Sequence, residues 1–283
     1  MITICGVKYN YTDGVLDISI QNLDDIPPEV YKLKYLTDLD ISFNNLNTIP
    51  PKIILLRHLE VLYIINNDVT HITSLIYKLS KLSILCLDNN KIKTIPPKLF
   101  LLKNLTALSL SNNQITSLPP RINQLNNLQV LILDNNKIND IPYDLCLMPS
   151  LRKLSLNNNN LTYISPTIEY LRNLNSLEIN NNKFQSFPNN ICYLFNLHTL
   201  DISHNQITSI PNQIKLLNRL STFIINNNEV KALPRSITTL NKLHKLDISN
   251  NQIKYIPYQL YCMPVLNIDP ELHITYTINP MHK

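Results

Sequence analysis

Residues 36–58 read LTDLDISFNNLNTIPPKIILLRH, and this stretch decides the fold. A shift of 23 residues brings back the same pattern without insertion or deletion, in repeats that begin at positions 13, 36, 59, 82, 105, 128, 151, 174, 197, 220 and 243. Self-similarity with a period of about 20 to 50 residues is the signature of a stacked-repeat architecture. The sequence therefore predicts a solenoid in which each repeat is one coil.

The repeat positions have distinct structural roles. The alternation around Leu39 and Ile41 predicts a short strand with both side chains on one face. Proline at the fifteenth position, as in Pro50, fixes φ and lacks an N–H, so it starts a return segment on the opposite side of the coil. Apolar residues at positions eighteen and twenty-one, as in Ile53 and Leu56, complete the core. One repeat cannot bury these side chains alone, so stability comes from stacking.

An asparagine at the ninth position follows each strand. Its amide has two donor hydrogens and an acceptor oxygen, so it can satisfy backbone groups where the chain turns. We expect these amides to form a buried structural ladder, with Gln21 replacing asparagine in the first repeat. The asparagines of this ladder are Asn44, Asn67, Asn90, Asn113, Asn136, Asn159, Asn182, Asn205, Asn228 and Asn251.

The expected architecture is an α/β solenoid, with a parallel sheet on the concave face and irregular, 3-10 or short helical segments on the convex face. Eleven repeats occupy residues 13–265, between an N-terminal cap (1–12) and a C-terminal cap or partial twelfth repeat (266–283) that begins at Leu266. Two repeats lack the usual proline and have Thr73 or Ser165 in its place. We expect their convex segments to be more helical.

With this repeat, the sequence resembles the leucine-rich-repeat proteins over nearly its full length. The 23-residue unit with I-P-x-x-I-x-x-L is similar to the intracellular subset typified by Ras-suppressor and Scribble-type repeats. That resemblance implies protein–protein binding, often around small GTPases, kinases or phosphatases. The PDZ modules that accompany Scribble-type repeats do not occur in this sequence.

Composition and motifs give no indication of catalysis. The formal net charge of +5 is diffuse, and five cysteines are widely spread without C-x-x-C pairs. Phosphate-binding G-x-x-x-x-G-K and nucleophile G-x-S-x-G motifs are missing, as is any histidine–cysteine spacing for metal. We expect no enzymatic activity, no cofactor and no metal. The N-terminus lacks a signal-peptide pattern, and no apolar stretch is long enough to span a membrane, so we expect an intracellular, cytoplasmic protein.

A partner would bind the concave face, at repeat positions three, five, seven and eight. These positions have eight acids and two lysines, a net charge of −6. The expected partner is therefore a protein with a basic surface, and not nucleic acid, whose phosphates this face would repel. An alternative interpretation of Asp17, Asp40, Asp201 and Asp247 is that they are generic surface residues, because L-D-L-S is a common form of the family consensus.

An apolar island interrupts the polar face. It comprises Val61, Tyr63, Ile65, Ile84, Cys86, Val130 and Ile132. Exposed apolar side chains with an aromatic and an acidic rim are typical of docking sites. Drift to isoleucine and valine under A/T-rich codon usage would explain the same residues. The candidate partner-binding residues are Phe43, Val61, Tyr63, Ile65, Ile84, Asp88, Val130, Ile132, Asp134, Glu178 and Asp201.

Three functional hypotheses follow. The first is a monomeric protein-binding scaffold or adaptor. The second is a regulatory or targeting subunit for a signalling enzyme of a GTPase, phosphatase or ubiquitin-ligase pathway. The third is polyanion binding through convex lysines, for example Lys52, Lys78, Lys81, Lys98 and Lys103.

Overall fold

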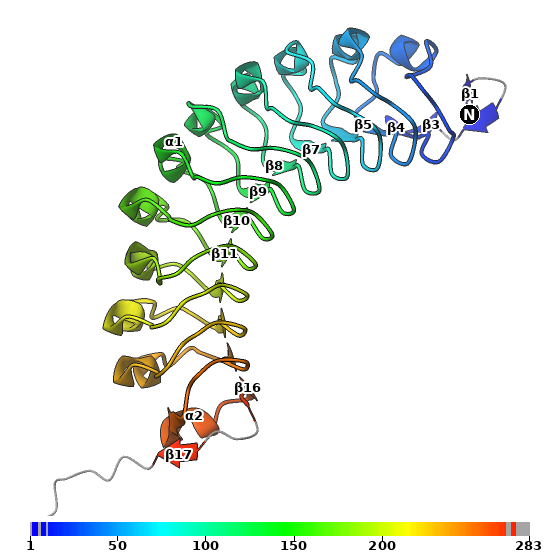
Figure 1. Cartoon of the computed structure of the whole chain (residues 1–283). Helices are drawn as coiled ribbons and strands as arrows, with labels where there is room; N and C mark the ends of the chain where they lie inside the picture. Colours follow the sequence, from blue (N-terminus) through cyan, green and yellow to red (C-terminus); the bar gives the residue numbers. More distant parts are fainter. Residues whose placement is uncertain (1, 5–6, 10, 270–272, 276–283) are drawn as a thin grey trace, which may run out of the picture. The chain divides into compact units, whose positions relative to one another are not determined.

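The computed structural model describes residues 2–4, 7–9, 11–269 and 273–275. The chain divides into two compact units, Met1–Leu151 and Arg152–Lys283, here called unit 1 and unit 2. Within each unit the strands lie on one side and short helices lie on the other (Figure 1). This layering is that of a repeat solenoid, as the 23-residue period predicts.

Unit 1 contains the first strands and 3-10 helices. Its strands are β1 (Ile2–Ile4), β2 (Val7–Tyr9), β3 (Tyr11–Thr12), β4 (Val15–Asp17), β5 (Asp38–Asp40), β6 (Val61–Tyr63), β7 (Ile84–Cys86), β8 (Ala107–Ser109) and β9 (Val130–Ile132). Its helices are η1 (Val30–Lys32), η2 (Pro51–Leu55), η3 (Ile76–Lys78), η4 (Pro97–Leu101), η5 (Ile122–Gln124) and α1 (Tyr143–Cys146). β1 and β2 form an antiparallel pair. β3 pairs antiparallel with β4, which starts the parallel series from β4 to β9.

Unit 2 repeats this arrangement. Its strands are β10 (Lys153–Ser155), β11 (Ser176–Glu178), β12 (Thr199–Asp201), β13 (Thr222–Ile224), β14 (Lys245–Asp247), β15 (Tyr255–Pro257), β16 (Val265–Asn267) and β17 (His273–Thr275). Its helices are η6 (Pro166–Tyr170), η7 (Asn189–Tyr193), η8 (Asn212–Leu216), η9 (Arg235–Thr239) and α2 (Tyr258–Tyr261). Strands β10 to β14 pair in parallel in chain order and β16 follows β14, while β15 pairs with β17. In the described part of the chain, no helix combines the length and the apolar character needed to cross a membrane.

The strand register reproduces the sequence period. Leu39 pairs with Leu62, and Leu177 pairs with Leu200, each 23 residues apart. Both leucine stacks are fully buried, together with Ile53 on the return segment. Because each coil places the same residue type at the same depth, side chains one repeat apart fill the space between coils. The core of each unit is therefore a set of parallel leucine and isoleucine rows.

The ninth-position amides tie successive coils together. The Asn113 side-chain amide donates to the carbonyls of Leu87 (3.0 Å) and Leu110 (3.1 Å), and its oxygen accepts from the Ile92 N–H (2.9 Å). Its neighbours repeat this arrangement, and nine of these asparagines, from Asn44 to Asn228, are buried. Asn251 has the same bonds but is only half-buried, since it lies in the last full turn.

The convex segments correct one prediction. The repeats with Thr73 and Ser165 form the 3-10 helices η3 and η6, while α-helical turns occur instead at α1 and α2. The repeats of α1 and α2 share a proline at position twenty-two, Pro149 or Pro264. In several other repeats the N–H at that position donates to the carbonyl at position twenty, as Arg172 does to Tyr170 (2.8 Å). Proline cannot donate this bond, so the preceding turn takes a different form.

The last strand of the described parallel series departs from the 23-residue period. The sequence predicts a C-terminal cap or a partial twelfth repeat from Leu266, and in the structure Leu266 pairs with Leu246, the fourth residue of its repeat. The register step between β14 and β16 is thus 20 residues and not 23. In the sixth repeat three residues separate Pro149 from β10, whereas β16 follows Pro264 directly. Of the predicted cap 266–283, the structure describes residues 266–269 and 273–275.

We expect Asn113→Leu to lower the free energy of unfolding by about 1–3 kcal/mol, because it leaves the Ile92 N–H without a partner in the core. The carbonyls of Leu87 and Leu110 each lose one donor but keep the amide of Asn90 or Asn136. Urea denaturation monitored by circular dichroism measures this loss. The neighbouring change Gln114→Ala, at a half-exposed side chain, is the control and should shift stability by less than about 0.5 kcal/mol. An equal loss in the two variants would contradict the ladder role.

Candidate functional site

The strands of unit 1 bring most of the apolar island together. Val61 lies opposite Ile84, and Tyr63 lies opposite Cys86, on the paired strands β6 and β7. All four side chains are partly exposed. Side chains of directly paired residues on one sheet face are in contact distance. Here they form one continuous apolar surface.

Ile65 follows β6 in the same repeat, whereas Val130 and Ile132 on β9 are separated from this surface by one strand. β8 places Ala107 between Ile84 and Val130, and Ser109 between Cys86 and Ile132. Ser109 is buried, and its hydroxyl donates to Asp88 Oδ1 at 2.6 Å. The island therefore has two apolar parts with a narrow strip of small residues between them.

The strand face of unit 1 is acidic. The term strand face refers here to repeat positions three, five, seven and eight. In unit 1 these positions have no lysine or arginine, and their acids are Asp17, Asp38, Asp40, Asp88 and Asp134. Asp38 and Asp40 pair directly with Val61 and Tyr63, so carboxylates border the apolar surface. This charge favours a partner with basic groups around an apolar centre.

Most of these carboxylates also bind the backbone. The Ser42 N–H donates to Asp40 Oδ1 (2.8 Å), and the same turn recurs in each L-D-I-S repeat. In three repeats whose fifth residue is not aspartate, the preceding repeat supplies the acceptor. Ile65 N–H donates to Ser42 Oγ (3.1 Å), and Ser111 N–H donates to Asp88 Oδ1 (2.6 Å). Asp40 and Asp88 each accept a hydrogen bond from a seventh-position N–H, so they have a structural role besides their charge.

The strand face of unit 2 has a polar network in place of an apolar surface. Lys153 Nζ lies 2.7 Å from Glu178 Oε1, and Ser176 Oγ donates to the same oxygen (3.1 Å). Burial raises the pKa of Glu178, but Lys153 and the hydroxyl and amide donors around it outweigh burial, so the pKa lies below its usual value. Asp201 accepts from Asn180 Nδ2 (3.0 Å) and from Ser203. Both predicted partner-binding acids already have protein donors.

The backbone conformation at the eighth repeat position supports Phe43 as a site residue. It also indicates Ile20, which was not among the residues predicted from the sequence. The eighth position has a positive φ in every repeat, and asparagine, which tolerates the left-handed region, occupies most of these sites. Ile20 (φ 57°) and Phe43 (φ 56°) are strained there, yet their side chains are 72% and 55% exposed. Strain at exposed apolar residues points to function. The sequence alone could have indicated both residues, because Ile20 and Phe43 are apolar at a repeat position that is asparagine in most other repeats.

The thiol of Cys86 in the apolar island stays protonated near pH 7. Burial raises the pKa of the Cys86 thiol to about 11, with Asp88 and Asp40 acting in the same direction. Burial likewise raises the pKa of Tyr63, next to Cys86, Asp38 and Asp40. Both groups stay neutral near pH 7, so they contribute apolar contact area and not a nucleophile.

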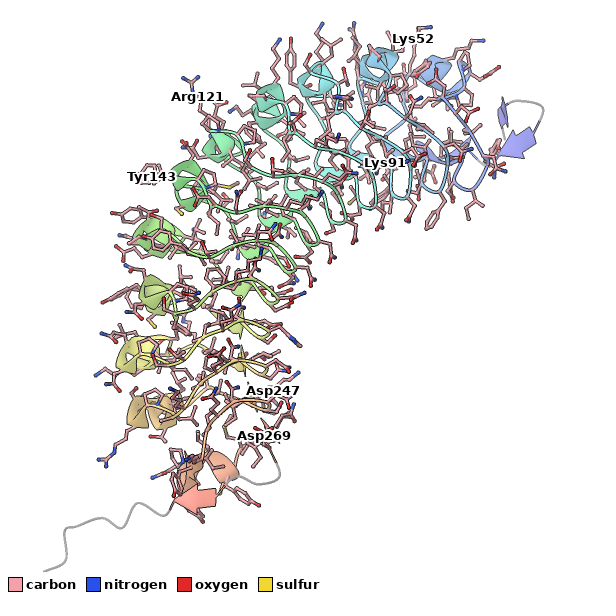
Figure 2. The ribbon with its side chains drawn as sticks, in the orientation of Figure 1. Lys52, Lys91, Arg121, Tyr143, Asp247 and Asp269 are labelled. Carbon is pink, nitrogen blue, oxygen red and sulfur yellow. The ribbon has the colours of Figure 1, made fainter. Side chains whose placement is uncertain are left out.

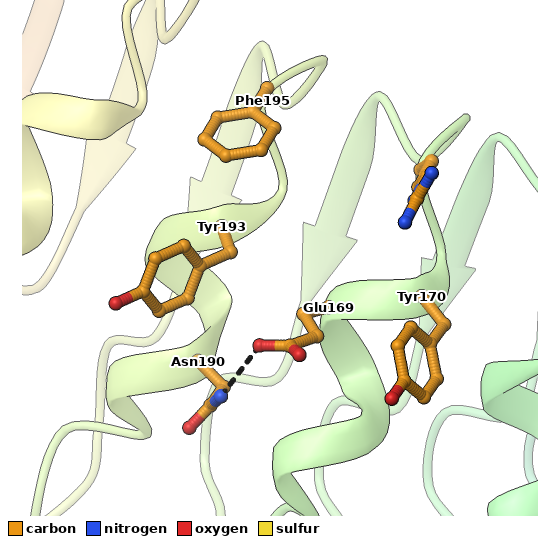
Figure 3. A pocket seen from close by; sticks show the side chains of 6 residues that line it. Glu169, Tyr170, Asn190, Tyr193 and Phe195 are labelled. Atoms are coloured by element: carbon orange, nitrogen blue, oxygen red, sulfur yellow. Dashed lines mark hydrogen bonds between the residues drawn. The ribbon is translucent and has the colours of Figure 1, made fainter.

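The helical side of unit 2 has a pocket that the sequence patterns did not indicate. It has a volume of 660 Å³ and is lined by Glu169, Tyr170, Arg172, Asn190, Tyr193 and Phe195 (Figure 3). Asn190 Nδ2 donates to Glu169 Oε2 at 2.8 Å, and the rings of Tyr193 and Phe195 meet edge to face at 6.4 Å. Because the lining contains one charge of each sign, charge does not select a ligand for it.

The other charged side chains surround the coils. In unit 1, Lys52 and Arg121 project from the helical side (Figure 2). Lys91 pairs with Asp68 over 2.7 Å, but both side chains are more than half exposed, so this ion pair contributes little. Among the described residues, histidine, cysteine and acidic side chains do not gather in any group of three that could hold a metal ion.

Comparison with known families decides the identity. A leucine-rich-repeat model matches residues 34–92, 80–138, 103–161, 126–184 and 149–207, together more than half of the chain. A second leucine-rich-repeat model matches residues 242–263. The chain belongs to the leucine-rich-repeat family. Among curated protein sequences, none is significantly similar to this leucine-rich-repeat protein.

Solved structures share this fold. A leucine-rich-repeat protein of Leptospira interrogans is 25% identical with a TM-score of 0.61, over 92% of this chain and 95% of that one. The TDR receptor is 24% identical with a TM-score of 0.81, over 92% of this chain but 47% of the receptor. The repeats of FLRT2, solved in an octameric complex with latrophilin 3 and Unc5D, are 23% identical with a TM-score of 0.71, over 92% and 91%. The chain thus spans about half of the receptor and nearly all of the other two.

We expect Phe43→Asn to raise the free energy of unfolding of this leucine-rich-repeat protein by about 1 kcal/mol, because asparagine relieves the strain of the left-handed backbone. The reverse change, Asn66→Phe in the next repeat, should lower it by a similar amount. Urea denaturation of both variants measures these shifts. A loss of stability in Phe43→Asn would mean that the phenyl ring contributes to packing and not to a binding surface.

We expect Lys153→Met to raise the pKa of Glu178 and to destabilise unit 2 near pH 7. The lowered folded-state pKa gives stability that is present above the usual glutamate pKa and is lost as the pH falls through the folded value. The destabilisation should therefore fade in acid, where Glu178 is protonated. Carboxyl-carbon NMR titration and urea denaturation at about pH 7 and pH 3 test this. An equal loss at both pH values would assign the effect to packing.

Proposed function

We propose that this leucine-rich-repeat protein is a protein-binding scaffold or adaptor that uses the strand face of unit 1. The observation that carries the proposal is the apolar island next to Phe43, partly exposed and bordered by carboxylates without a neighbouring base on that face. Interface energies concentrate in a few apolar and aromatic side chains inside a polar rim. Tyr63 and Phe43 are the aromatic members of this surface.

The contrast between the units supports this location. Both units have the same backbone, and the same repeat positions lie on the strand face of each. In unit 2 those positions hold a lysine–glutamate pair and hydroxyl and amide groups that bind each other. Polar groups that already have partners give little on binding, whereas exposed apolar area does. A partner therefore gains more from unit 1.

The family supports a binding role and leaves its cellular setting open. The FLRT2 repeats, which share this fold, take part in an assembly with two other proteins. The subset with I-P-x-x-I-x-x-L, which resembles Ras-suppressor and Scribble-type repeats, favours an intracellular partner. The thiol of Cys192 is buried and forms no disulfide, which agrees with a reducing compartment. We infer an intracellular adaptor whose partner has a basic surface.

We expect Tyr63→Asp and Ile132→Asp each to abolish capture of the main partner from a lysate of the native host, because a charge replaces buried contact area. Ile224→Asp is the matched control, since Ile224 occupies the same repeat position in unit 2 and is equally half-buried. Quantitative mass spectrometry of captured proteins, with circular dichroism to confirm folding, provides the measurement. Capture that survives in both unit 1 variants would overturn this location. Identification of the captured protein as a GTPase, phosphatase or ubiquitin ligase would make the chain a targeting subunit.

A further inference from the structure

A second site lies in unit 1, away from the strand face. Lys34, Tyr35, Leu55, Arg57 and His58 line a pocket of 310 Å³. Lys34 and Tyr35 follow η1, Leu55 is the last residue of η2, and Arg57 and His58 follow η2, so the lining comes from the ends of two consecutive return segments. Ligand pockets in proteins range from about 300 to 1,000 Å³, so this one has room for a single small group. We call it the basic notch.

A neighbouring lysine orients the imidazole of the notch. Lys81 Nζ lies 3.1 Å from His58 Nδ1. Since an ammonium group can only donate, Nδ1 is the acceptor, and the hydrogen of the neutral ring is on Nε2. The ring of Tyr35 meets the ring of His58 at 5.7 Å with a tilt of 46°. The imidazole is thus held from two sides, with an N–H donor available to a ligand.

The cations of the notch have no competing acid. Among the residues that the structure describes, neither Lys34 nor Arg57 has an ion-pair partner. The lining contains no carboxylate. Arginine presents a planar fork of donors that matches phosphate oxygens, and lysine adds a point charge. The donors of the notch therefore suit a dianionic phosphate.

The remaining lining decides which phosphate fits best. Leu55 is 50% exposed and Tyr35 is 74% exposed, so an apolar and an aromatic wall stand beside the cations. A free phosphate or a serine phosphate would leave these walls uncovered, whereas the ring of an aryl phosphate would cover them. We propose that the basic notch binds a phosphorylated tyrosine side chain of a protein partner. The phosphate would contact Arg57, Lys34 and His58, and the ring would pack against Leu55 and Tyr35.

The strand face of unit 1 disfavours a membrane or a nucleic acid that would extend from the notch onto that face. It has five acids and no base, which repel an extended polyanion there. A single phosphate on a neutral or basic peptide meets no such repulsion. The notch does not use the strand face, so this inference stands or falls separately from the proposed function.

Fluorescence anisotropy with labelled pentapeptides, in which the central residue is flanked by alanine and glycine, tests the inference on the full chain. The phosphotyrosine peptide should bind at least tenfold more tightly than the unphosphorylated and phosphoserine peptides. It should also bind at least tenfold more tightly than inorganic phosphate, whose affinity is measured by competition with the labelled peptide. Arg57→Gln should weaken it by roughly tenfold or more, because a charge-assisted bond is lost. Arg172→Gln, at the same repeat position in unit 2, is the matched control and should have no effect.

The other outcomes are decisive as well. Equal binding of phosphotyrosine and inorganic phosphate would reduce the notch to a general anion site and overturn the aryl preference. Tight binding only to anionic vesicles or single-stranded RNA would replace the peptide with a polyanion. If Arg57→Gln unfolds, titration of the unaltered protein, monitored by the His58 ring signals in NMR, decides the matter. Ring signals that do not move at saturating phosphotyrosine peptide would exclude the site.

Discussion

The buried asparagine amide at the ninth position is the interaction on which this structure depends. Each amide joins its own coil to the preceding one, as Asn113 does through Leu110 in its own repeat and through Leu87 and Ile92 in the repeat before it. A leucine core can tolerate small changes of register, but a buried amide cannot, because each misplaced donor or acceptor is left without water or a partner. The amides therefore hold the coils at the spacing of 23 residues that the sequence shows.

This constraint divides each repeat into determined and variable positions. The core and the ninth residue are determined, whereas the strand face can vary if two backbone needs are met. The seventh N–H needs an acceptor, from its own repeat as in Asp40 or from the preceding repeat as in Asp88. The eighth residue must adopt a left-handed backbone, which asparagine does most easily. Phe43 occupies this position although phenylalanine disfavours a left-handed backbone, so its presence there indicates a functional role.

The two units use this freedom differently. Unit 1 combines an apolar island with an unopposed acidic border, while unit 2 has groups that bind one another across strands β10, β11 and β12. Away from the strand face, Lys34 and Arg57 share a notch whose lining contains no acid. Separate surfaces of one regular scaffold thus suit an acid-bordered protein contact and a phosphate contact.

The repeat period, the strand positions, the asparagine ladder and the position of the apolar island could all be read from the sequence, because each depends on spacing along one chain. Three features could not. The α-helical turns depend on whether position twenty-two can donate a bond, and the shortened last repeat depends on how β16 pairs with β14. The basic notch joins residues 23 positions apart, and the orientation of His58 comes from Lys81 in the next coil. Contacts between neighbouring coils determine these features. The periodic pattern does not show which exposed side chains of neighbouring coils come into contact.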